Sequence, residues 1–114
     1  MSAVYVNNIV INIGSDFVQT FVLEAAATNS TLDLTNYTVS AQMRKWSGSS
    51  TAITFTIEKS YPETSGTIVL SLTSTQTLSI KPGRYVYDVV ITGQDSVKTR
   101  VLEGMVLARE GVTR

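Results

Sequence analysis

The sequence predicts an all-β domain: an immunoglobulin-like sandwich of two antiparallel sheets with about seven strands. Thr, Ser, Val and Ile dominate the chain, and β-branched residues favour strands because their stiff side chains suit a pleated surface. No stretch combines Ala, Leu, Glu and Lys with a helical period. Turn-forming clusters divide the chain at intervals of about 10–15 residues, a spacing that favours a sandwich over a barrel.

Length and composition narrow the function classes. A chain of 114 residues forms a single domain, 1–114. Cysteine and histidine are absent, which excludes thiol chemistry, the commonest general base and the commonest metal ligands. Nine basic and nine acidic residues cancel, so we expect no nucleic-acid partner, while packing against copies of itself carries little electrostatic cost. We also expect no cofactor. No charged-then-apolar leader and no apolar run of about 20 residues is present, so we expect no membrane association.

Alternation of apolar and polar residues places the strands. The segment 37–46 is the clearest, because Tyr37, Val39, Ala41 and Met43 alternate with polar residues along it. The segment 25–36 is expected to be a loop with a short bridge at Leu32–Leu34. The seven expected strands are 3–13, 16–24, 37–46, 52–58, 67–72, 83–93 and 97–108.

One short helical turn is expected near residues 73–79, because Thr73 and Gln76 have the spacing of a capping box. The strand after this connection begins with Gly83 and Tyr85. Sandwich folds often place at this point a tyrosine whose hydroxyl bonds back to the preceding connection, so we expect a structural role for Tyr85.

The strand GRYVYDVVI is apolar on both sides, which is unusual for a small sandwich. Tyr85, Tyr87, Val89 and Ile91 share one side, whereas the other carries Val86, Val90 and a carboxylate, Asp88. We expect the opposite sheet to cover the first side, and a partner subunit or a crossing loop to half-bury the second. A cross-strand cation, Lys98 or Arg100, is the expected partner of Asp88.

Catalytic constellations are scarce. No two carboxylates have a spacing that forces a shared site, and no glycine-rich phosphate loop follows a strand. Trp46, beside Arg44 and Lys45, is the one residue suited to stacking on a sugar or a base. The alternative, which we favour, is that Trp46 packs at a protein interface, where Trp is enriched.

Four stretches resemble a small β-sandwich domain that recurs in structural proteins of tailed bacteriophages, including the N-terminal domain of baseplate upper proteins and virion proteins of cyanobacterial phages. The stretches are LDLTNYTVSAQMR (32–44), SLTSTQTLSI (71–80), GRYVYDVVI (83–91) and RVLEGMVLAREGVTR (100–114). Asn36 stands where that family usually has Gly, a mild departure because Asn also tolerates a left-handed turn. The chain also stops where many relatives continue into a fibre, stalk or receptor-binding module.

The resemblance implies a non-enzymatic virion subunit, made in the host cytoplasm: a capsid decoration, neck, tail or baseplate component. Its implied partners are copies of itself and other virion proteins, such as the major capsid, neck or tail proteins. The expected contact residues are Tyr5, Val6, Ile9, Trp46, Val112, Thr113 and Arg114. The alternative for Tyr5 and Ile9 is a place in the core. The alternative for the tail, Val112–Arg114, is that it frays and makes no contact. The rival functions are a host-surface glycan-binding module that uses Trp46 and the loops at one end of the sandwich, and a hydrolase with a carboxylate pair.

Overall fold

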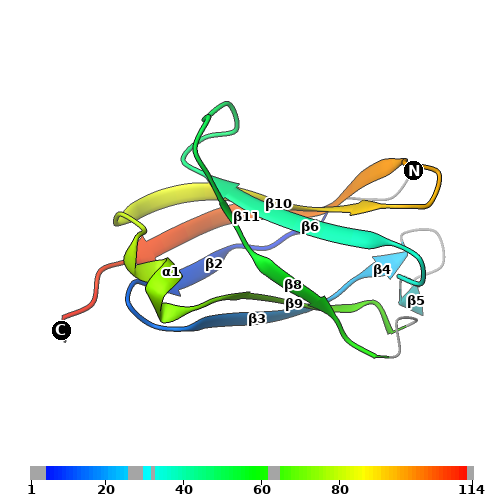
Figure 1. Ribbon diagram of the computed structural model, residues 1–114, viewed down its shortest axis with the longest axis horizontal. Helices are drawn as coiled ribbons and strands as arrows, with labels where there is room; N and C mark the ends of the chain where they lie inside the picture. The colour runs from blue at the N-terminus through cyan, green and yellow to red at the C-terminus, as the bar shows by residue number, and fades with distance from the viewer. Residues whose placement is uncertain (1–4, 26–29, 32, 62–64, 113–114) are drawn as a thin grey trace.

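The computed structural model describes residues 5–25, 30–31, 33–61 and 65–112, whose strands form two stacked sheets (Figure 1). The larger sheet contains β1 (Tyr5–Val6), β2 (Ile9–Asn12), β6 (Thr38–Arg44), β7 (Ala52–Thr54), β10 (Gly83–Thr92) and β11 (Lys98–Arg109). Its strand order is β1-β11-β10-β6-β7, with β2 also paired to β11. The predicted all-β sandwich is confirmed.

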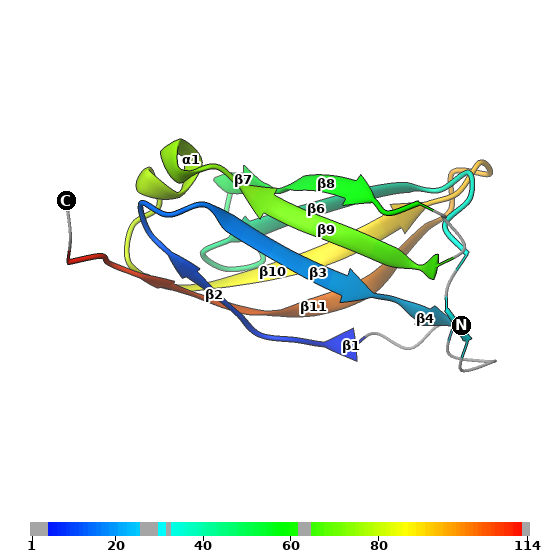
Figure 2. The same ribbon diagram turned by 90° about the horizontal axis from the view of Figure 1, so that it is seen from below.

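The smaller sheet lies against the larger one and is seen from its outer side in Figure 2. It contains β3 (Phe17–Val22), β9 (Thr67–Leu72) and β8 (Thr56–Lys59), in that order. This is an immunoglobulin-like arrangement, in which β6, β10 and β11 take the places of strands C, F and G, and β3, β9 and β8 those of B, E and D.

The first two strands depart from the expected all-antiparallel pairing. Both β1 and β2 run parallel to β11, with Tyr5 opposite Leu102 and Val10 opposite Leu107. After β2 the chain turns at Gly14, which has a φ of 87°, and enters β3 of the other sheet. The chain therefore changes sheets between its second and third strands instead of folding back as a hairpin, and a parallel pairing with the last strand results.

The expected single strand 52–58 is two strands in different sheets. β7 pairs with β6, whereas β8 pairs with β9, and the chain crosses between the sheets at Phe55. The Phe55 N–H still donates to the Ala41 carbonyl at 3.0 Å. Its buried ring lies 5.9 Å from the ring of Phe17 and 6.3 Å from that of Tyr87, between centroids. Alternation continues through the crossing because Phe55 points into the core that both sheets share.

The core lies between the sheets and is formed by the inward side of each strand. Ala41 and Met43 are buried, as their alternation predicts, and Phe17, Phe21 and Leu23 are buried opposite them in the smaller sheet and just after it. Fully buried residues from both sheets meet there: Ile11, Met43, Ile68, Leu70, Val89 and Val106. Each such side chain contributes about 1.5–3 kcal/mol by leaving water.

The segment between β3 and β6 differs in detail from the expectation. A two-residue ladder joins β4 (Glu24–Ala25) to β5 (Ser30–Thr31), so the short pairing lies before the expected bridge at Leu32–Leu34. Leu32 lies outside the described residues, and Leu34 is buried in the core. Asn36 has a φ of 65°, so it adopts the left-handed conformation at the position where the resembled family has Gly.

The predicted helical turn is α1 (Ser74–Leu78), and the predicted capping box is present. The Thr73 hydroxyl accepts a hydrogen bond from the Gln76 N–H at 3.2 Å, and the Gln76 side chain accepts one from the Thr73 N–H at 2.8 Å. The hydroxyl of Thr77, on the buried side of the turn, accepts a bond from Gly14 N–H at 3.1 Å and donates to the Ser15 carbonyl at 2.9 Å. These bonds attach α1 to the turn between β2 and β3.

The connection from α1 to β10 carries the expected tyrosine contact. The Tyr85 hydroxyl donates to the Lys81 carbonyl oxygen at 2.7 Å. This bond closes the turn at Lys81–Gly83 and fixes the angle at which β10 enters the larger sheet. Among the described residues, no helix has the length and apolar character needed to cross a membrane.

Candidate protein-interaction face

The outer side of the larger sheet, which faces away from the smaller sheet, carries the second apolar side of β10. Tyr87, Val89 and Ile91 are buried between the sheets, as predicted. Val86 and Asp88 alternate with them and point outward, and Val86 keeps 37% of its surface exposed. The second apolar side of this strand is therefore only partly covered by the rest of the described chain, with Val86 exposed and Val90 half-buried. We call this side of the larger sheet the outer face.

Strand register gathers apolar side chains on the outer face. Met105, Val86 and Arg44 are direct neighbours in a row across β11, β10 and β6. Val10 and Leu107 are neighbours one step along the strands, on the same side as Met105. The exposed apolar side chains of the outer face are Val6, Val10, Trp46, Val86, Met105 and Leu107. Single exposed apolar residues are ordinary, but a contiguous group on one sheet face marks an interaction surface.

Charged side chains form a small network in the same face. Arg100 Nε lies 3.3 Å from Asp88 Oδ2, and Arg100 Nη1 lies 3.7 Å from Glu103 Oε1. The cross-strand partner predicted for Asp88 is confirmed as Arg100. All three side chains are partly exposed, so each pair contributes at most about 1 kcal/mol to folding. The network leaves one surplus negative charge on this part of the face.

Trp46 lies on the connection between β6 and β7, which rises above the sheet in Figure 1. Arg44 Nη1 donates to the Ser49 carbonyl at 2.5 Å, and Ser49 N–H donates to the Trp46 carbonyl at 2.9 Å, so the turn is tied to the end of β6. The Trp46 side chain is nevertheless 61% exposed. Arg44 Nη2 also donates to Gln42 Oε1 at 3.1 Å, which holds the guanidinium over the outer face.

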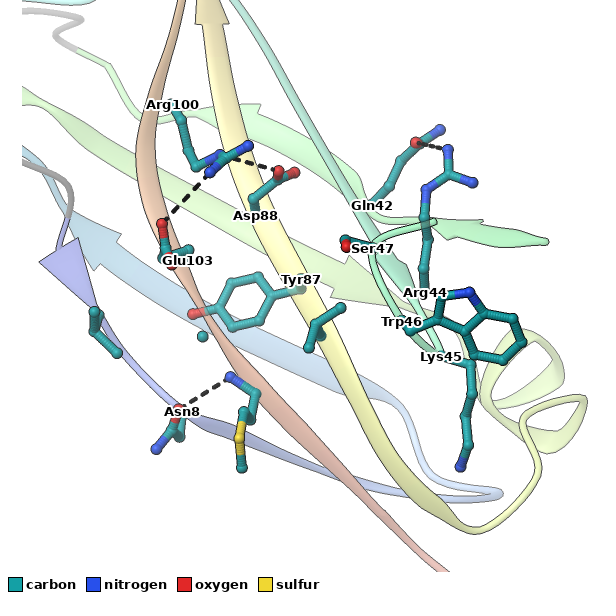
Figure 3. A pocket seen from close by; sticks show the side chains of 14 residues that line it. Asn8, Gln42, Arg44, Lys45, Trp46, Ser47, Tyr87, Asp88, Arg100 and Glu103 are labelled. Carbon is teal, nitrogen blue, oxygen red and sulfur yellow. Dashed lines mark hydrogen bonds and ion pairs between the residues drawn. The ribbon is translucent and has the colours of Figure 1, made fainter. Parts of the chain in front are cut away.

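A hollow of about 930 Å³ lies on the outer face. Figure 3 shows Trp46 and Arg44 on one side of this hollow and Glu103 and Asn8 on the other. Val86 and Met105 also line it. The hollow therefore combines an exposed indole, apolar side chains and charges of both signs.

The edge of the hollow near β1 and β2 is shaped by a step in the chain at Asn7 and Asn8. The Tyr87 hydroxyl, reaching from the core, donates to the Asn7 carbonyl at 2.5 Å, and Asn8 Oδ1 accepts from Met105 N–H at 3.0 Å. A Cβ on Gly104 would collide with the Asn7 carbonyl oxygen, so only glycine fits there. Burial raises the pKa of Tyr87 to about 12, and the hydroxyl stays protonated as a donor at neutral pH.

The structure divides the contact residues expected from the sequence. Val6 and Trp46 both lie on the outer face, with Val6 73% exposed. Ile9 is 4% exposed and belongs to the core, so it is not a surface contact, and the alternative given for it holds. Tyr5 belongs to β1, but its side chain is not among those described. Val112 is 96% exposed beyond the end of β11.

Thr113 and Arg114, the rest of the expected tail contact, lie outside the described residues. Sequence reasoning missed Val10, Met105 and Leu107 as members of the outer face. The alternation of VLEGMVLA marks two sides of a strand, but it does not say which side faces the core. Ile9 and Ile11 are both buried, so Val10 between them points to the opposite side of β2 and belongs to the outer face.

The remaining carboxylates show no shared site within the described ranges. No group of three or more Asp, Glu, His or Cys side chains there is placed to hold a metal ion. Asp33 accepts bonds from the Thr35 hydroxyl at 2.6 Å and the Thr35 N–H at 2.9 Å, and these hold its pKa below the usual value. Asp33 is exposed in the turn before β6, where the bonds stabilise the loop locally.

Comparisons with known proteins show likeness in fold at most. No family model matches the sequence, and no curated protein matches it. The chain is similar to part of an internalin-like protein of Listeria monocytogenes, with 11% identity and a TM-score of 0.45 over 95% of this chain and 28% of that one. It is also similar to part of a family 123 glycoside hydrolase from Clostridium perfringens, with 10% identity and a TM-score of 0.42 over 96% and 24%. The chain thus spans about a quarter of each protein, and neither likeness carries an argument about function.

Proposed function

We propose that this protein is a non-enzymatic structural subunit of a bacteriophage virion, a capsid-decoration, neck, tail or baseplate component that acts through protein contacts. The single observation that carries the binding role is the outer face, where exposed apolar side chains from β1, β10, β11 and the connection after β6 line one hollow. The phage setting comes from the resemblance of residues 32–44, 71–80, 83–91 and 100–114 to virion domains.

Two further features support an assembly role. The formal net charge is zero, so copies and neighbours can pack closely without strong repulsion. The outer face is built on β10 and β11, the longest strands of the described chain, so its backbone is held by a regular strand ladder. An apolar face held in this way loses little backbone conformational entropy on binding. The partners proposed are copies of the chain and other virion proteins, with the virion as its location.

Quantitative mass spectrometry of purified virions tests this proposal. We expect the chain to be present at a fixed copy number relative to the major capsid protein. The variant Met105→Glu puts a charge on the outer face and should reduce incorporation at least about tenfold, because an unpaired charge in an interface is costly. Val18→Glu is the matched control, since Val18 is exposed on the smaller sheet. Absence of the chain from virions contradicts the proposal.

The second candidate is a host-surface glycan-binding module, and the exposed Trp46 beside Arg44 and Gln42 favours it. An indole stacks on the apolar face of a sugar, while the guanidinium and amide supply hydrogen bonds to hydroxyls. Binding of the isolated protein to host polysaccharide, lost in Trp46→Ala and kept in Tyr61→Ala, supports this function. Tyr61 is a suitable control because it is an exposed aromatic residue outside the hollow.

A further inference from the structure

We propose, resting on the proposed assembly function, that the outer face binds the same face of a second copy of this chain. The two copies are related by a two-fold axis that lies in the plane of the interface. This axis crosses β10 between Val86 and Asp88. A two-fold interface requires a patch that is complementary to itself, in apolar surface and in charge. The outer face meets both requirements.

The size of the face suits a stable dimer. Five strand positions cross the larger sheet. The strands range from three residues in β7 to twelve in β11, so with strands about 4.8 Å apart and a rise of about 3.3 Å per residue the face covers roughly 600 Å². Two copies together then bury roughly 1,200 Å², which reaches the lower end of the range for specific protein interfaces.

The charges of the face are complementary under this symmetry. Arg44 lies on β6 beside Val86, and Glu103 lies on β11 beside Asp88, so the two residues flank β10 on opposite sides and one step apart. An axis perpendicular to the line from Arg44 to Glu103, through its midpoint, exchanges the two ends of that line. Arg44 of each copy is thereby placed over Glu103 of the other. Two such contacts form, and each joins opposite charges.

Trp46 and the hollow fit the same arrangement. Trp46 lies beyond Arg44 on the raised connection after β6, at one side of the hollow (Figure 3). The axis places it beside Val6 and Asn8 of the second copy, at the opposite side of that copy's hollow. An indole buries about 150–250 Å² and packs well where an apolar side chain lies next to a polar one. Each hollow therefore receives the exposed indole of the facing copy.

Trp46 is the only tryptophan, so its fluorescence reports on this interface directly. Sedimentation equilibrium over a concentration series should show a monomer–dimer transition. The Trp46 emission maximum should move to shorter wavelength in step with the dimer fraction, because the indole leaves water. If the molar mass shows the transition but the Trp46 emission maximum does not move, the dimer contact lies on another surface. This result overturns the proposal.

Charge reversal gives a sharper test. Arg44→Glu produces two like-charge contacts in its own dimer, and so does Glu103→Arg, so each should raise the dimer dissociation constant more than about tenfold. Mixing the two variants restores both contacts. In one contact the new carboxylate at position 44 faces the new guanidinium at position 103, and in the other the unchanged arginine faces the unchanged glutamate. The mixture should therefore form a heterodimer with nearly the original affinity.

Two exposed residues outside the hollow supply the matched charge controls. Lys81→Glu and Glu58→Arg change the net charge by the same amounts as the test variants. Both control variants should dimerise like the wild type, because neither position lies in the contact. Equal weakening in the controls and the test variants would mean that net charge alone governs association, and it would overturn the proposed pairing.

The outcomes separate this inference from the proposed function. Failure of the mixture to dimerise, or a monomer at every concentration, overturns the two-fold pairing. If Met105→Glu is then still lost from virions, the outer face serves a different virion protein and the proposed function stands. If the chain is absent from virions although the dimer forms as described, the pairing stands and the virion role fails.

Discussion

The Tyr87 hydroxyl donates a hydrogen bond of 2.5 Å to the main-chain carbonyl of Asn7, from the core side of the larger sheet to the step between β1 and β2. The two residues are 80 positions apart in the sequence. The bond satisfies a carbonyl that leaves the strand ladder, and it holds one edge of the hollow in place.

Tyr87→Phe should destabilise the fold by about 1–3 kcal/mol at neutral pH, because the Asn7 carbonyl loses its partner. The free energy of unfolding should also depend on pH in a way that is specific to Tyr87. Tyr87 has a pKa of about 12 when folded, against about 10 for an unperturbed tyrosine. Above about pH 10 the unfolded chain releases this proton while the folded chain keeps it, so stability falls as pH rises toward about 12.

Urea denaturation of both proteins at about pH 8 and about pH 11 measures this difference. The wild type should lose more stability between the two pH values than Tyr87→Phe does. The other four tyrosines are common to both proteins and cancel in the comparison. Equal losses contradict the assignment of the raised pKa to Tyr87.

Gly104→Ala should destabilise the fold by about 1–3 kcal/mol or more, as overpacked sites do. The new methyl group would collide with the Asn7 carbonyl oxygen, and backbone cannot yield as a flexible side chain can. Gly48→Ala is the control, since a Cβ there meets Trp46 at an ordinary 3.6 Å. Thermal unfolding followed by circular dichroism compares the two, and a harmless Gly104→Ala would refute the close approach.

Thr77→Val should cost about 1–3 kcal/mol, because it keeps the shape of the side chain but leaves Gly14 N–H and the Ser15 carbonyl without this hydroxyl as a partner. Thr75→Val, in the same helical turn but exposed, controls for helix propensity. Chemical denaturation measures the free energy of unfolding of both variants, and the difference between them gives the contribution of the buried hydroxyl. If both variants are equally stable, α1 is not anchored through Thr77.

Tyr85→Phe should cost about 1 kcal/mol through loss of the bond to the Lys81 carbonyl. Lys45 Nζ lies 4.8 Å from the centre of the Tyr85 ring, and this contact survives in the variant. Tyr61→Phe, at a 94% exposed position, should change nothing measurable. Denaturant midpoints distinguish the two, and identical values would remove the structural role of Tyr85.

The individual strands of the sandwich, the capping box at Thr73 and Gln76, and the Tyr85 contact could be predicted, because each depends on residues close in sequence. Pairings between distant strands were not predictable in the same way. The bulge between Val89 and Val90 shifts the register with β11, and there Val101 and Leu102 are both buried in succession. Simple alternation fails at such a point.

The outer face was only half predictable for the same reason. The two apolar sides of the strand at Val86 suggested a covered second face, and Trp46 was recognised from its type. Met105 and Leu107 join them through the register of β10 with β11, and Val10 joins them only through the parallel pairing of β2 with β11, which no local pattern encodes. The crossing at Phe55 was hidden because its inward direction continues the alternation of both flanking strands.

The parallel pairing of β2 with β11 also sets the order of events during synthesis. Val10 has no strand neighbour until Leu107 has left the ribosome, whereas the hairpin of β10 and β11 closes locally. Contacts between such distant segments form late and slowly. A nascent chain therefore lacks the complete outer face until β11 has been synthesised, and in the proposed assembly this delay would prevent premature association.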